Sequence, residues 1–124
     1  MFEIIQILIF GQEPASKVSH RKLERLMRRK FGIRAGEVNQ KFQRINSDSP
    51  NGKNRFSAAI LKVANRDFEK IDYYINLCNY DFRDVVAAAE YPERMRFAFN
   101  KIAGWKKRQI YLDDWKTYST WLQK

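Results

Sequence analysis

The residues whose chemistry points most clearly to a function are the basic side chains between positions 17 and 44. This segment holds ten Lys or Arg against two acidic residues, Glu24 and Glu37, so it carries +8 of the chain's formal charge of +10. Concentrated positive charge attracts polyanions: nucleic acid, an anionic membrane surface or an acidic protein. The side chains that we expect to bind a nucleic acid are Arg21, Arg25, Arg28, Arg29, Lys41 and Arg44.

Catalytic and metal-binding residues are scarce. The chain has one histidine, His20, and one cysteine, Cys78, whereas a structural zinc site takes four Cys or His ligands. We interpret His20, which stands among arginines, as a surface residue, and Cys78, at helical spacing from Ile71 and Ile75, as a buried one. No glycine-rich phosphate motif is present. Hydrolysis by carboxylates alone stays open, but no acidic cluster indicates it. We therefore expect a protein that is not an enzyme and has no cofactor and no metal.

A helix over 19–31 positions the first group of arginines. Its spacing puts an apolar stripe on one face, made of Leu23, Leu26, Met27 and Phe31, and arginines on the other, namely Arg21, Arg25, Arg28 and Arg29. Ser19 is suited to cap its start, and Gly32 to follow its end in a left-handed conformation. A second helix is expected from about 35 to 45, burying Val38, Phe42 and Ile45.

These two helices and the glycine between them have the length of a helix-turn-helix motif. The apolar residues around the turn fit that motif: Met27, Phe31, Ile33 and Val38. Arg28, four residues before the glycine, does not, because close helix packing there favours a small residue. In this interpretation Gln40, Lys41 and Arg44 face bases, while Arg21, Arg25 and Arg29 hold phosphates. Any helical hairpin with a glycine turn matches equally well.

The rest of the chain predicts a loop followed by short helices. Residues 46–54, NSDSPNGKN, have turn composition and predict a loop and hinge. Helices are then expected from 55, from an Asp67 cap, from an Asp81 cap to about Glu90, and from Pro92 until Gly104 stops it, with a last short helix capped by Asp113. The predicted buried residues are Phe56, Ile60, Val63, Ile71, Ile75, Val85, Met95, Phe99 and Ile102.

The first apolar segment has an ambiguous period. Residues 3–10 fit a helix or a strand, and as a strand they would pair with 109–112, the other β-like run, or with a second copy of the chain. Its apolar run, Ile4 to Phe10, follows Glu3, where a signal peptide would be basic, and it is much shorter than the roughly 20 apolar residues of a membrane span. With a single cysteine, the chain fits a cytoplasmic protein without membrane insertion.

A motif spans residues 55–92. It runs R-x-x-x-A-x-L-K from Arg55, D-x-x-K from Asp67, Y-D-x-R-D-V from Tyr80 and A-E-Y-P from Ala89. It resembles a motif of short uncharacterised bacterial proteins, a family to which no activity is assigned. The resemblance covers about a third of the chain, and it implies a bacterial origin and a compact helical unit but no function.

The residues of the motif favour a structural role. Asp81 and Asp84 suit a helix N-terminus and resemble a capping box. The three alanines at 87–89 allow close helix packing, and Arg83 is suited to pair with a carboxylate of another element.

Taken together, the sequence predicts an all-α protein, a compact bundle of about five or six short helices, with a minor β pairing of the terminal segments left open. We expect one domain over 1–124, made of a cationic helical hairpin at 17–45, a loop at 46–54 and a helical unit at 55–124. The expected function is non-enzymatic nucleic-acid binding, to DNA or RNA, through the hairpin. The alternative is a module that docks on an acidic protein partner. Binding at a membrane surface ranks third.

Overall fold

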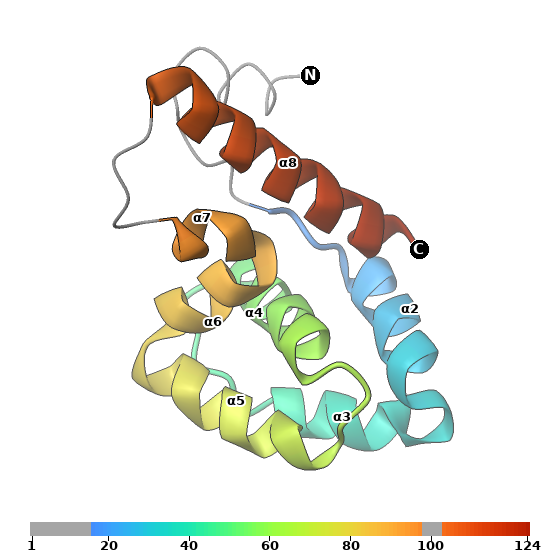
Figure 1. Ribbon diagram of the computed structural model, residues 1–124. Coiled ribbons are helices and arrows are strands. Elements are labelled where there is room, and N and C mark those ends of the chain that lie inside the picture. The colour runs from blue at the N-terminus through green and yellow to red at the C-terminus, as the bar shows by residue number, and fades with distance from the viewer. Residues whose placement is uncertain (1–15, 98–102) are drawn as a thin grey trace.

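The structure, a computed structural model, describes residues 16–97 and 103–124 of the chain, and they form an all-α bundle with no strand among them (Figure 1). The predicted fold class is confirmed. The segment 3–10 lies outside the described residues. The helices are α2 (His20–Phe31), α3 (Ala35–Phe42), α4 (Pro50–Ala64), α5 (Glu69–Tyr80), α6 (Phe82–Glu90), α7 (Pro92–Arg96) and α8 (Gly104–Gln123), with a 3-10 turn, η1 (Gly32–Arg34), between the first two.

Helix α2 begins and ends where its sequence predicts. The Ser19 hydroxyl accepts a hydrogen bond from the Lys22 amide at 3.1 Å and so satisfies one free amide of the first turn. At the other end Gly32 has a φ of 55°, a backbone conformation that side chains disfavour. Helix α3 stops at Phe42 instead of 45, but Ile45 is still buried, as are Val38 and Phe42.

The loop before α4 is shorter than predicted. Residues 50–54 are helical, because Ser49 and Pro50 act as N-cap and first helical residue: the Ser49 hydroxyl accepts from the Gly52 amide at 3.0 Å. The prediction of a loop was therefore wrong for residues 50–54. A Cβ at Gly52 would lie 2.4 Å from the Ser47 hydroxyl oxygen, so a larger residue there requires the exposed Ser47 side chain to move.

Helix α4 lies in the middle of the bundle, with α2 on one side and α5 and α6 on the other, while α8 runs along one edge and reaches α2 near its end (Figure 1). One continuous core joins these elements. Of the predicted core residues, four are confirmed as buried, namely Ile60, Ile71, Ile75 and Val85. Phe56 and Val63 are half-buried against this core. Phe99 and Ile102 lie outside the described residues.

A carboxylate caps α6, as predicted, whereas the residue directly before α5 is Phe68 and not the predicted Asp67. The Asp81 carboxylate accepts from the Arg83 amide at 3.1 Å, and the Asp67 carboxylate accepts from the Glu69 amide at 3.1 Å. The capping box with Asp84 is not formed, because the Asp81 amide donates to the Leu77 carbonyl at 2.8 Å and thereby closes the end of α5.

The last part of the chain differs most from expectation. Gly104 begins α8 where we predicted a stop, Asp113 lies inside this helix, and residues 109–112 are helical. The reason is a helical period that local signals obscured: Tyr111, Tyr118 and Leu122 are buried along one face. Helix α7 does begin at Pro92, but it is short, and Met95 is 45% exposed where burial was predicted.

Within 16–97 and 103–124, no helix has the length and apolar character needed to cross a membrane.

Candidate nucleic-acid interface

Three arginines of α2 form one exposed surface, which we call the arginine face: Arg21, Arg25 and Arg28. At 100° per residue these three lie opposite the buried side of α2, so burial of the apolar stripe turns them outward. Among the described residues, no carboxylate lies within ion-pair distance of any of the three. The only acidic residue of α2 is Glu24, which is also exposed. The arginine face is therefore a cationic surface whose guanidinium groups pair with no carboxylate of residues 16–97 and 103–124.

Arg29 does not belong to this face, which corrects our prediction. Its side chain is half-buried on the flank of α2 that meets α8. The guanidinium donates to the Trp121 carbonyl at 3.3 Å and lies 5.4 Å from the centre of the Trp121 ring. That carbonyl is in the last turn of α8, where a cation is favoured by the helix dipole. Arg29 therefore holds two helices together.

Lys41 of α3 and Arg44, two residues beyond its end, contact the carboxylate of Asp72. Lys41 donates to one oxygen of Asp72 on α5 at 2.6 Å, and Arg44 donates to the other oxygen. The hydrogen bond from Lys41 is the main reason that the pKa of Asp72 is lowered. These two predicted site residues are thus close together but partly neutralised.

The helix-turn-helix interpretation loses part of its basis. Ile33, expected among the packed apolar residues of the turn, is fully exposed on η1. Gln40 is exposed on α3, but Lys41 and Arg44 are held by α5. His20 is exposed at the start of α2, as predicted.

The structure adds cations that the sequence reasoning missed. Lys30 lies over the Trp121 ring at 5.9 Å and donates to the Asn65 side-chain oxygen at 2.8 Å. Burial lowers the pKa of Lys30, and so do the positive charges of Arg29, Arg66 and Lys124. These residues come from the ends of α2, α4 and α8, so no local charge run signalled their meeting.

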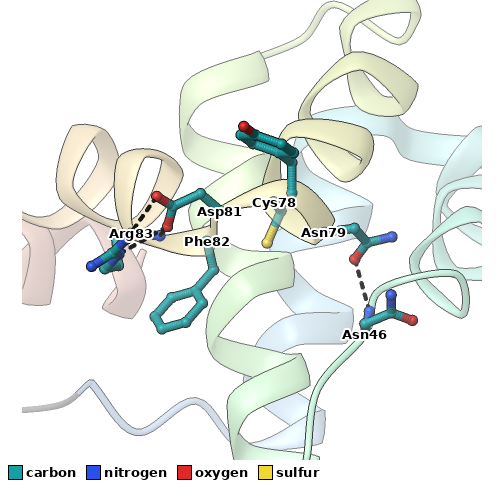
Figure 2. A pocket seen from close by; sticks show the side chains of 7 residues that line it. Asn46, Cys78, Asn79, Asp81, Phe82 and Arg83 are labelled. Carbon is teal, nitrogen blue, oxygen red and sulfur yellow. Dashed lines mark hydrogen bonds and ion pairs between the residues drawn. The ribbon is translucent and has the colours of Figure 1, made fainter.

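A hollow of about 590 Å³ lies where α5 meets α6, and its polar side chains bind one another (Figure 2). The Asn79 side-chain oxygen accepts from the Asn46 amide at 2.8 Å. Arg83 pairs with Asp81 at 3.0 Å, at the start of its own helix. We had predicted that it would pair with a carboxylate of another element, and that prediction was wrong. Burial raises the pKa of the Cys78 thiol to about 11, so the thiol is protonated at neutral pH. The polar groups of this hollow thus stabilise the fold by binding one another. The prediction of a buried Cys78 is confirmed.

The two ends of the motif over 55–92 are joined inside the bundle. The Arg55 guanidinium donates to both oxygens of Glu90, at 2.9 and 3.0 Å, and Glu90 is 1% exposed. The Lys62 ammonium donates to the Ala89 carbonyl at 2.7 Å. These bonds fasten α6 to α4, which supports the structural interpretation of the motif.

A buried carboxylate of α8 caps α7 from outside that helix. The Asp114 oxygens accept from the Glu93 amide at 3.3 Å and the Arg94 amide at 2.9 Å. Burial raises the pKa of Asp114, and these two backbone hydrogen bonds offset part of the shift.

Within the described part of the chain, no group of three or more His, Cys, Asp or Glu side chains is placed to hold a metal ion. Comparison with known proteins adds no relative: no protein-family model matches the chain, and neither does any curated protein or any solved structure. The resemblance of residues 55–92 to a bacterial family stays a prediction.

Proposed function

We propose that this protein binds nucleic acid, and that the arginine face supplies phosphate contacts. The observation that carries the proposal is the set of three exposed guanidinium groups on one side of α2, without an ion-pair partner among the described residues. A guanidinium forks onto two phosphate oxygens, and phosphate contacts supply most of sequence-independent affinity.

The two cations beyond α2 have a smaller part in this proposal. A phosphate that binds Lys41 or Arg44 must compete with the Asp72 carboxylate, which already takes a hydrogen bond from each. The proposed interface is therefore centred on α2. Binding of this kind does not require that α3 enter a groove of DNA.

The test replaces the arginine face by glutamine, in the variant Arg21→Gln/Arg25→Gln/Arg28→Gln. Binding of the full chain to a fluorescent duplex of about 20 base pairs is followed by anisotropy at graded salt. Each phosphate contact adds about 0.9 to the magnitude of the log–log salt slope. We expect weaker binding and a slope reduced by up to about 2.7 if all three arginines hold phosphates.

A matched control removes the same charge elsewhere. Lys106, Lys107 and Arg108 are three exposed cations at the start of α8, and their replacement by glutamine should leave a larger slope than the α2 variant. Equal slopes for the α2 variant and the wild type would remove the arginine face from the interface. If the wild type binds neither DNA nor RNA at low salt, the proposal fails, and an acidic protein becomes the partner to seek.

A further inference from the structure

A groove of about 210 Å³ lies between the start of α2 and the second half of α8. The side chains that matter in it are Lys17 and Lys22 from one side, and Trp115 and Ser119 from α8. It thus combines an aromatic ring, two ammonium groups and a hydroxyl in a space outside the arginine face.

Trp115 is held in place. Its indole is half-buried and packs against Tyr111 and Leu112 of the same helix. The other two tryptophans differ from it: Trp121 is covered by Arg29 and stacks on Tyr118 at 5.5 Å, while Trp105 is 68% exposed near the start of α8. Of the three, Trp115 alone lines this groove of the described structure.

The charge of the groove continues that of the arginine face. Lys22 follows Arg21 directly in α2, and Lys17 is exposed just before the helix. Neither lysine has an ion-pair partner within residues 16–97 and 103–124. A polyanion on the arginine face therefore meets further cations next to Trp115 as it crosses the flank of α2.

Base pairing decides which nucleic acid suits this arrangement. In a duplex each base is stacked between its neighbours, so an indole cannot reach its face, whereas an unpaired base is free to stack on an aromatic side chain. We propose that the groove binds a single-stranded segment of DNA or RNA, with a base on Trp115 and adjacent phosphates on Lys17 and Lys22. This inference rests on the proposed function and specifies its ligand.

The test compares the variants Trp115→Ala and Trp105→Ala. Each removes one indole from α8, but only the first removes it from the groove. Affinities of the full chain are measured by anisotropy for a labelled oligothymidylate of about 12 nucleotides and for a duplex of matched charge. Stacking on one base corresponds to about tenfold in affinity. We expect Trp115→Ala to weaken single-strand binding by about that factor and to change duplex binding by less than about twofold, while Trp105→Ala alters neither.

A second variant covers the case in which Trp115→Ala loses helicity. Lys22→Gln leaves the indole in place and should reduce the salt slope for the single strand by about 0.7. The inference is overturned if a folded Trp115→Ala protein binds the single strand like the wild type. If Trp115→Ala does not fold, the deciding variant is Lys22→Gln, and wild-type binding of the single strand by that variant overturns the inference. A wild type that binds only duplex overturns it too, yet leaves the proposed function intact; a wild type that binds neither overturns both.

Discussion

The ion pair between Arg55 and Glu90 makes the interior sensitive to a single change of charge. Glu90 is 1% exposed and the Arg55 side chain is 23% exposed, so replacing Glu90 leaves a largely buried guanidinium without its counter-charge. Breaking a buried pair from one side costs about 3–5 kcal/mol. Because Arg55 keeps some contact with water, we take the lower end, about 3 kcal/mol, for Glu90→Gln.

This free energy translates into a melting shift that is easy to measure. Unfolding entropy is about 2.1 cal/mol/K per residue, or about 260 cal/mol/K for 124 residues. A loss of about 3 kcal/mol should therefore lower Tm by about 12 °C. Circular dichroism at 222 nm follows both the thermal and the urea transitions.

The control is an exposed pair of the same kind. Glu37 pairs with Arg34 at 3.3 Å, and both side chains are about half exposed, so Glu37→Gln should cost less than about 1 kcal/mol. The double variant Arg55→Met/Glu90→Leu should recover most of the loss, since apolar residues of similar size can replace a buried pair. Two results would refute the reasoning. One is a Glu90→Gln protein whose free energy of unfolding lies within about 1 kcal/mol of the wild-type value. The other is a double variant that is no more stable than the Glu90→Gln protein.

Three further changes test other parts of the bundle by urea unfolding. Ile75→Ala empties a fully buried site and should cost about 2–5 kcal/mol. Asp81→Ala removes the cap of α6 and should cost about 0.5–2 kcal/mol; loss of nucleic-acid binding at unchanged stability would contradict this role. Asp114 has a raised pKa in the folded protein, so its contribution to stability is full below about pH 3.9 and is lost as pH rises through the folded value. Asp114→Asn should abolish that decrease, and an unchanged pH profile would count against burial as its cause.

The features that sequence alone predicted are those determined within one helix. The two faces of α2 and its Ser19 cap follow from residues a few positions apart, and so does the cap at Asp81. The failures have two sources: the local cap at Ser49 and Pro50 was taken for part of a loop, and contacts between distant parts of the chain do not show in a short segment. Gly104 has the local chemistry of a helix end, yet it begins α8, a helix whose buried face lies further along, from Tyr111 to Leu122.

The candidate site shows the same division. The outward direction of Arg21, Arg25 and Arg28 follows from the helical period, but Arg29 was assigned to the wrong surface because only the tertiary structure places Trp121 beside it. The pairing of Lys41 with Asp72 and the groove at Trp115 likewise depend on helices that are far apart in sequence.

The buried thiol of Cys78 allows local opening of the protein to be measured by alkylation. The side chain is 4% exposed with a pKa of about 11, and it is the chain's single cysteine. An alkylating reagent therefore reacts at one position, and in the native protein only when the end of α5 separates from its neighbours. The alkylation rate of the native protein, divided by that of the protein unfolded in urea, gives the equilibrium constant of this separation when reclosing is fast. Mass spectrometry of the labelled chain can then rank how tightly each variant holds that corner of the bundle, without unfolding the rest.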